Sequence, residues 1–316
     1  MTRHLRRLLA KILINRVKLL KKTTVFGVGY MSIKPRLLEG ELLIYNGMVF
    51  VVKGYQHPRD HVIAYPRYDL FTGVKIPIYL YTKYQNIVYW DCIKQYVNMI
   101  PLKGSVKYSK KTINNHYEWI VSYLSSILNI DINNIELTGS APFTDKWHDI
   151  DLVIYGCTSE IVDKVADLIE RGVLNRTREH VLVNEYFEKH VNNLSLREYL
   201  YLKKDTLLHL DIMGHHVNLK LYRYDKGFNT CIHPVSRVDL FTGKLHVFNG
   251  LTPSLLPSIY MASTSGVEEL FIETYRELYA ELKPGVYYAE NCRLEHRDDG
   301  LFLVPDNCVF KPVQTP

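Results

Sequence analysis

The sequence lacks the features that mark several classes of protein. Its five cysteines are odd in number and form no CxxC pair, so we expect neither a disulfide framework nor a cysteine zinc site. The apolar stretch at 8–20 is interrupted by Lys11 and Arg16 and is shorter than the roughly 20 residues that a membrane span needs. No small-residue cleavage site follows it. These absences predict a soluble, cytoplasmic protein with no signal peptide and no membrane span.

Acidic residues are missing from the beginning of the chain. Residues 1–38 contain ten Lys and Arg and no Asp or Glu, whereas residues 39–316 hold 29 basic and 33 acidic side chains. The net charge of +6 therefore comes from residues 1–38, which we interpret as a basic N-terminal arm. Such an arm either contacts nucleic acid or an anionic surface, or is an incidental extension. The sequence leaves both interpretations open.

Glutamine is also scarce. The chain has four glutamines and 24 tyrosines. Few thermolabile amides are typical of thermophilic proteins, so the composition is compatible with a source that grows at high temperature.

The pattern of apolar residues divides the rest of the chain into three parts. Residues 39–104 read as a β-rich domain, with a hairpin turn at Asn46-Gly47 and a second one around Thr72-Gly73. Residues 105–225 alternate helices and strands, and residues 226–316 read as a small α/β-rich domain with a helix over 267–282. This order predicts an α+β protein, with a mixed-sheet core between small β-rich domains.

The segment "ELTGSAPFTDKWHDIDLVIYG", residues 136–156, carries the chemistry that we consider most specific. Asp149 and Asp151 are two residues apart on an expected strand, so their carboxylates project from one face and can share a divalent cation such as Mg²⁺. Gly139 lets the backbone approach a phosphate closely, and Ser140 adds a hydroxyl and an amide donor. Each half alone is common, but their conjunction predicts a metal site facing a phosphate site.

With these motifs, the chain resembles the DNA polymerase beta-like nucleotidyltransferase superfamily. "TGSAPFTDKWHDIDLVIYG" is similar to the superfamily signature over about residues 110–225. "HPRDHVIAYPRY", "DIDLVIYG" and "CRLEHRDDG" are similar to segments of an archaeal family of predicted nucleotidyltransferases with β-rich flanks, over about residues 39–310. The resemblance implies a nucleotidyltransferase core at 105–225. It also implies that Gly139 and Ser140 bind a nucleoside triphosphate, while Asp149 and Asp151 coordinate Mg²⁺, which Mn²⁺ can replace.

The resemblance also implies a third carboxylate on a later strand, and the chain departs from the pattern there. The corresponding stretch is "GHHVNLKL", in which Asn218 stands at the expected aspartate position. An amide oxygen can ligate Mg²⁺, but it cannot accept the proton of an attacking hydroxyl. Asp211 on the preceding strand, as a third metal ligand, and Asp225 are the alternatives, and neither fits the pattern well.

Two further groups of residues have a functional and a plain interpretation. Lys220 lies on the strand of Asn218, where it would neutralise a triphosphate or be an ordinary surface cation. In "HPRDH", His57, Asp60 and His61 either approach a metal or form a turn with solvent-facing histidines.

The sequence therefore predicts a Mg²⁺-dependent enzyme that moves a nucleoside monophosphate from a triphosphate to an acceptor hydroxyl and releases pyrophosphate. A nucleic acid is one candidate acceptor. The alternative is a catalytically weakened protein that binds a nucleotide or a nucleic acid on the same core. The sequence identifies neither the nucleotide nor the oligomeric state.

Overall fold

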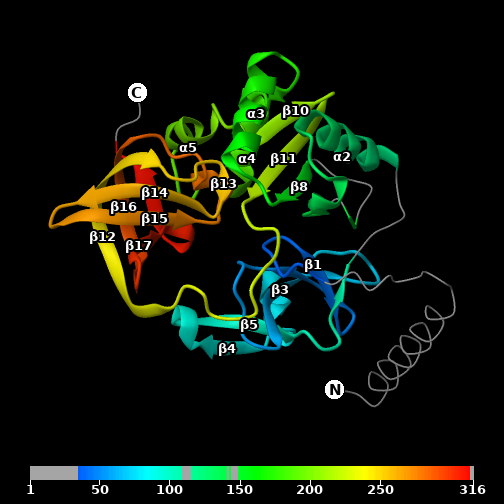
Figure 1. Ribbon diagram of the computed structural model, residues 1–316, viewed down its shortest axis with the longest axis horizontal. Coiled ribbons are helices and arrows are strands. Elements are labelled where there is room, and N and C mark those ends of the chain that lie inside the picture. The colour runs from blue at the N-terminus through cyan, green and yellow to red at the C-terminus, as the bar shows by residue number, and fades with distance from the viewer. Residues whose placement is uncertain (1–34, 109–114, 141, 144–148, 314–316) are drawn as a thin grey trace. The chain divides into compact units, whose positions relative to one another are not determined.

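The fold is described from a computed structural model, in residues 35–108, 115–140, 142–143 and 149–313. Most of the expected basic arm, residues 1–34, lies outside the described residues. The described residues form three six-stranded sheets, which follow one another along the chain except that strand β13 of the second sheet comes after strand β12 of the third (Figure 1).

The first sheet is antiparallel and has the strand order β4-β5-β3-β2-β1-β6. The expected hairpin at Asn46-Gly47 is confirmed: both residues have positive φ, which the tight turn between β1 and β2 requires. Its strands are β1 (Leu42–Tyr45), β2 (Met48–Val52), β3 (His61–Asp69), β4 (Ile87–Trp90), β5 (Gln95–Pro101) and β6 (Val106–Lys107), and its short 3-10 helices are η1 (Ile78–Lys83) and η2 (Asp91–Ile93).

The second sheet carries the candidate site and has the order β7-β8-β11-β10-β9, with β13 beside the end of β11. The β7–β8, β10–β11 and β9–β10 pairs are antiparallel, and β8–β11 and β11–β13 are parallel. The strands are β7 (Ile135–Thr138), β8 (Ile150–Tyr155), β9 (Asn175–Arg176), β10 (His209–Ile212), β11 (His215–Tyr222) and β13 (Leu255–Leu256). The helices are α2 (Asn115–Leu128), α3 (Ser159–Glu170), α4 (Glu179–Lys189) and α5 (Leu196–Lys203), with the 3-10 helix η3 (Ile132–Asn134).

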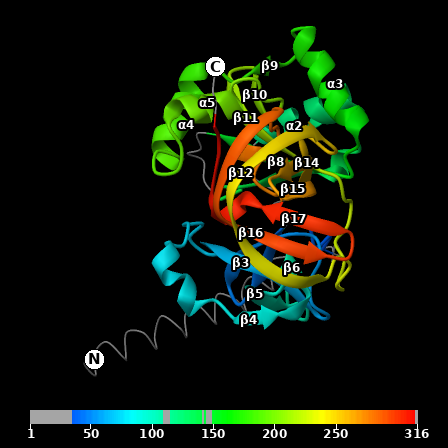
Figure 2. The ribbon, with the colours of Figure 1, turned by 90° about the vertical axis from the view of Figure 1, so that its left-hand side faces the viewer.

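The two faces of the second sheet differ in chemistry. Ile150, Leu152 and Ile154 of β8 alternate with Asp149 and Asp151, and the apolar set is buried in one cluster with side chains of α2 and α3. In Figure 2, α4 and α5 lie on one side of β10 and β11, and α3 lies on the other. The face opposite α2 and α3 therefore receives the polar side chains of the strands.

The third sheet closes into a five-stranded barrel, because β12 pairs with both β14 and β16 at the two ends of the order β12-β14-β15-β17-β16. Its interior is filled by apolar side chains such as Tyr260, Ile272 and Leu303. Figure 2 shows the long, curved strands β12 and β16. The strands are β12 (Val235–Gly250), β14 (Ser258–Thr264), β15 (Val267–Thr274), β16 (Gly285–Arg297), β17 (Gly300–Val304) and β18 (Val309–Pro312), with η4 (Glu277–Tyr279) and η5 (Pro305–Asn307).

The expected fold class, an α+β protein built on a mixed-sheet nucleotidyltransferase core, is wrong. Among the described residues, strands account for 43% and helices for 22%, and the architecture is dominated by antiparallel sheets and the barrel. The expected helix over 267–282 is the clearest local error, because residues 267–274 form barrel strand β15 and the 3-10 helix η4 follows. Packing inside the barrel overrides the helical spacing of the apolar residues there.

The expectation that the cysteines form no disulfides is also wrong. Cys92 is bonded to Cys231, which lies 139 residues further along the chain, and Cys292 is bonded to Cys308, 16 residues away. Cys157 is free and buried. The first disulfide joins η2 of the first sheet to the segment before β12, and the second joins β16 to the segment before β18.

Candidate functional site

The polar face of the second sheet aligns candidate residues in a row across four strands. Asp151 of β8 pairs with Thr138 of β7 on one side and with Asn218 of β11 on the other, and Asn218 pairs with His209 of β10. Paired residues of neighbouring strands project from the same face. The strand order thus brings together the residue before the Gly-Ser turn, the acidic pair and the position of the expected third carboxylate.

Asn218 bridges the two aspartates. Its Nδ2 donates a hydrogen bond to Oδ2 of Asp149 at 3.2 Å and another to Oδ1 of Asp151 at 3.1 Å. The side chain is buried, with 4% of its surface exposed, and its Oδ1 is buried with no hydrogen-bond partner among the described residues. We call Asp149, Asp151 and Asn218 the acidic cluster.

Gly139 lies against the acidic cluster in a conformation that favours glycine. Its φ is +67°, and a Cβ placed on it would lie 2.0 Å from Oδ2 of Asp151. The chain then turns, with the Phe143 amide donating to the Ser140 carbonyl at 2.9 Å. The expected proximity of the Gly-Ser turn and the acidic pair is therefore present in the structure.

The environment of Asp149 combines burial with like and unlike charges. Burial and the neighbouring Asp151 carboxylate raise the pKa of Asp149, while Lys189 opposes the shift. Nζ of Lys189 lies 3.9 Å from Oδ2 of Asp149 and 3.3 Å from Oε1 of Glu185. Burial alone would lower the pKa of Lys189, but Glu185 and then Asp149 outweigh it and raise this pKa.

Lys189 is a site residue to which the sequence did not point. The spacing of Glu185 and Lys189 is typical of a helical ion pair, and the structure shows that pair on α4. The reach of Lys189 to Asp149 depends on how α4 packs against the sheet. No local pattern reveals that contact.

The structure does not bring Asp211 into the acidic cluster. Its Oδ2 accepts hydrogen bonds from Nε and Nη2 of Arg178 at 3.2 and 3.0 Å, and its Oδ1 accepts one from the Gly214 amide. Asp225 is exposed, and its carbonyl accepts a hydrogen bond from Arg36. The Asp211 carboxylate thus has a structural partner of its own, and no contact joins Asp225 to the acidic cluster among the described residues.

Lys220 lies on the polar face but is paired with a carboxylate. Its Nζ lies 3.1 Å from Oε1 of Glu277 in η4, and this ion pair raises the pKa of Lys220 despite burial. Glu277 also lies 3.5 Å from Nε2 of His209, which is 2% exposed. Lys220 therefore belongs to a partly buried polar network between the second sheet and η4, and no triphosphate contact is needed to account for it.

His57, the other sequence candidate, is fully buried. Its Nε2 lies 2.8 Å from the Leu37 carbonyl, and its Nδ1 accepts a hydrogen bond from the Ile63 amide at 3.2 Å. The ring is thus a neutral tautomer with the proton on Nε2, and burial lowers its pKa to about 4. Both nitrogens are used within the first sheet, so neither is available to a metal.

The acidic cluster offers two carboxylates of the kind that a hard divalent cation binds. No group of three or more His, Cys, Asp or Glu side chains that could hold a metal occurs among the described residues. Magnesium nevertheless commonly takes one or two carboxylates from a protein and completes its shell with water and phosphate oxygens. Rotation of the Asn218 amide by 180° would point the unpartnered Oδ1 towards the two carboxylates. Three oxygens repel one another at such short range, so this orientation requires a cation between them.

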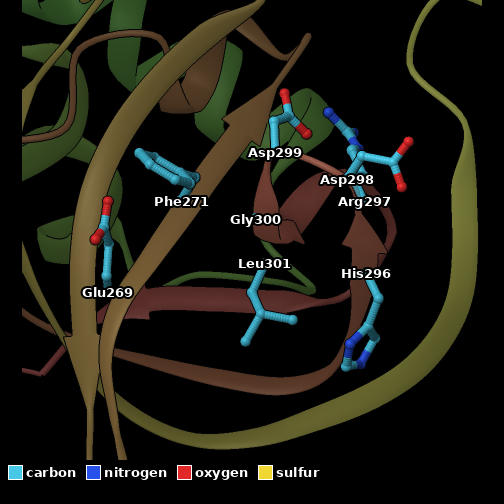
Figure 3. Close-up of a pocket in the computed structure, with 8 residues that line it drawn as sticks. All are labelled: Glu269, Phe271, His296, Arg297, Asp298, Asp299, Gly300 and Leu301. Carbon is cyan, nitrogen blue, oxygen red and sulfur yellow. The ribbon is translucent and has the colours of Figure 1, made fainter.

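The barrel carries a shallow pocket of about 420 Å³ that contains none of these residues. Figure 3 shows Leu301 between Glu269 on one side and His296 on the other. His296 is paired with Asp239, and Arg297, which also lines the pocket, is paired with Glu273 and Glu295. The two basic side chains that line this pocket are thus paired with carboxylates.

The chain has no match among protein-family models, curated proteins or solved structures. In the part of the chain that the structure describes, no helix combines the length and the apolar character needed to cross a membrane. The function is therefore inferred from the site itself.

Proposed function

We propose that the protein binds a nucleoside triphosphate through one divalent cation at the acidic cluster, and that it transfers the nucleotide slowly or not at all. The single observation that carries this proposal is the double hydrogen bond from Asn218 to Asp149 and Asp151. Asn218 places an amide at the position where the resemblance implies a third carboxylate.

Each part of the cluster supports binding. Asp149 and Asp151 offer two carboxylates to a cation, and Lys189 offers a positive charge beside them. The glycine at position 139 leaves the space that the Asp151 carboxylate occupies, so it keeps this carboxylate in the cluster. A bound Mg²⁺ would screen the phosphate charges and lower the pKa of a coordinated hydroxyl.

In nucleotide transfer, the step that the cluster supports poorly is removal of the proton from the acceptor hydroxyl. Asn218 cannot accept that proton, and Asp211 is held by Arg178. The cluster therefore lacks a third carboxylate of the kind that the resemblance implies, among the residues that the structure describes.

A second candidate function is full nucleotidyl transfer to an acceptor hydroxyl, with release of pyrophosphate. One observation favours it: burial, with Asp151 beside it, raises the pKa of Asp149, and a carboxylate with a raised pKa is a better proton acceptor. In this case Asp149 would serve as the base while Asp151 holds the cation.

The proposal is tested by equilibrium binding of ATP, GTP, CTP and UTP with Mg²⁺, with Mn²⁺ and with a chelator. We expect cation-dependent binding that Asp151→Asn abolishes and that Asp211→Asn leaves unchanged, because Asp211 lies on the same face but is engaged by Arg178. Binding that does not depend on Asp151 or on the cation would overturn the proposal. Transfer of an α-phosphate label to an RNA, DNA or protein acceptor at ordinary enzymatic rates would favour the second candidate.

A further inference from the structure

The ammonium group of Lys189, the last residue of α4, contacts two carboxylates that belong to different elements. Its Nζ lies 3.3 Å from Oε1 of Glu185 on the same helix and 3.9 Å from Oδ2 of Asp149, the residue before strand β8. The first contact follows from the spacing of four residues along a helix. The second joins α4 to the acidic cluster, so both carboxylates share one positive charge.

Glu185 is held beside the acidic cluster by partners other than Lys189. Its Oε2 accepts a hydrogen bond from the hydroxyl of Tyr199 in α5 at 2.9 Å, and it lies 3.7 Å from Nδ1 of His209 in β10. The Glu185 side chain is only 15% exposed. Its carboxylate should therefore remain in place when the lysine is removed.

Without Lys189, the carboxylates of Asp149 and Glu185 would face each other with no positive charge between them. Like charges at this range repel, and a hard divalent cation is the usual ligand of such a pair. Sites that transfer phosphoryl groups often hold two divalent ions, each shared between protein carboxylates and phosphate oxygens. In this protein the ammonium group of Lys189 is already the counter-ion of both carboxylates.

We propose that the Lys189 ammonium fills the position of a second divalent cation, so that the site takes one ion and not two. The inference rests on the proposed function and deepens it, because it assigns the number of bound cations to a residue of α4. An ammonium group is a compact positive charge that can attract phosphate oxygens. It has no coordination position for a hydroxyl, so it cannot activate one as a divalent ion does.

The test counts Mn²⁺ ions bound to the nucleotide-free protein, from the EPR signal of free Mn²⁺ during a titration. We expect the native protein to bind one ion, and Asp151→Asn to lose it. Lys189→Met should bind two ions, because Asp149 and Glu185 lose their counter-ion, whereas Lys189→Arg should keep one. Adding Glu185→Gln to Lys189→Met should restore the count to one, because a carboxylate of the second position is then missing.

Arg171→Met is the matched control. Arg171 at the end of α3 pairs with Asp167, four residues earlier, at 3.0 Å, and it forms no other ion pair among the residues that the structure describes. Its removal therefore also deletes a cation from a helical ion pair, but away from the acidic cluster. The number of bound Mn²⁺ ions should not change, and a second ion in this variant would overturn the inference.

The outcomes separate this inference from the proposed function. One ion of equal affinity in the native protein and in Lys189→Met would overturn the inference and leave the proposed function standing. An ion that binds to Lys189→Met but not to the native protein would uphold the role of Lys189 and contradict the proposed function. A second ion that persists after Glu185→Gln is added would lie elsewhere and overturn the inference, and the lack of any bound ion in both proteins would overturn both proposals.

Discussion

Gly139 and Asp151 touch so closely that position 139 has no space for a side chain. A Cβ there would lie 2.0 Å from Oδ2 of Asp151, well inside the contact distance of two nonbonded atoms. The carboxylate of Asp151 occupies the space that the missing side chain of Gly139 leaves free. The identity of residue 139 and the position of this carboxylate therefore depend on each other.

This contact predicts the effect of Gly139→Ala. The alanine would suffer the strain of a left-handed backbone and would also displace the Asp151 carboxylate, so we expect lower stability and loss of cation binding. Gly172→Ala is the matched control, because Gly172 has a φ of +71° and a Cβ placed on it would meet no atom within 4 Å. The control should cost about 1–2 kcal/mol and leave binding intact. Equal effects in both variants, by chemical denaturation and Mg²⁺ titration, would contradict the role of this contact.

Asn218→Asp should convert the cluster into three carboxylates. Without a cation, the variant loses both hydrogen bonds and gains like-charge repulsion, so we expect a loss of about 2 kcal/mol in the free energy of unfolding. Mg²⁺ should recover this loss, and transfer of nucleotide should increase. Asn218→Ala, which loses the bonds without adding a charge, should show no recovery. Thermal unfolding with and without Mg²⁺ provides the measurement, and equal Mg²⁺ responses of the two variants would count against the proposed metal site.

The buried His57 should make the free energy of unfolding depend on pH. Burial lowers its pKa to about 4 in the folded protein, whereas the unfolded chain has the ordinary value of about 6.5. The unfolded state therefore binds the proton first, and stability that is present above pH 6.5 is lost as the pH falls towards 4, by about 3 kcal/mol. Urea unfolding of the native protein and of His57→Gln should show the steeper slope in the native protein. The same slope in both would exclude His57 as the cause.

Lys220→Met should destabilise the protein without a specific loss of nucleotide affinity. The substitution leaves the partly buried Glu277 without its closest cation, which we expect to cost about 2 kcal/mol. The double variant with Glu277→Gln should recover part of the loss, because the uncompensated charge is removed. Urea unfolding and ATP titration distinguish this structural role from the triphosphate contact that the sequence suggested. A tenfold drop in ATP affinity with unchanged stability would reverse the assignment.

The two disulfides should contribute unequally to stability. Loop-closure entropy predicts about 5 kcal/mol for the bond between Cys92 and Cys231 and about 3 kcal/mol for the bond between Cys292 and Cys308, because the first closes a far longer loop. Replacing each pair by serine and measuring unfolding at equilibrium tests the order. A larger loss for the shorter loop would show that chain entropy does not dominate.

Local patterns predicted several elements well. The hairpin at Asn46-Gly47 was predicted because Asn and Gly readily adopt the positive φ that its turn requires. The apolar residues Ile120, Leu124 and Leu128 of α2 recur at helical spacing, in line with the helices expected over 105–225. The Gly139 turn and the acidic pair are also local, which is why the sequence could place them together.

The errors arose where distant parts of the chain decide the outcome. Residues 267–274 have a helical spacing of apolar residues but form a strand, since the closed barrel supplies partners on both sides of β15. The pairing of Cys92 with Cys231 spans 139 residues and leaves no local signal. The same holds for Lys189, whose contact with Asp149 joins a helix to a strand through tertiary packing alone.

The short strand β13 has a consequence for dissecting the protein. Leu255 and Leu256 pair with Leu221 and Tyr222 at the end of β11, and the Arg223 amide donates to the Leu256 carbonyl. A fragment ending at residue 225 would leave these backbone groups facing water and the end of β11 prone to fraying. The acidic cluster is therefore best studied in a chain that retains residues 255–256, because the sheet that carries the cluster includes strand β13, which lies between two strands of the barrel in the sequence.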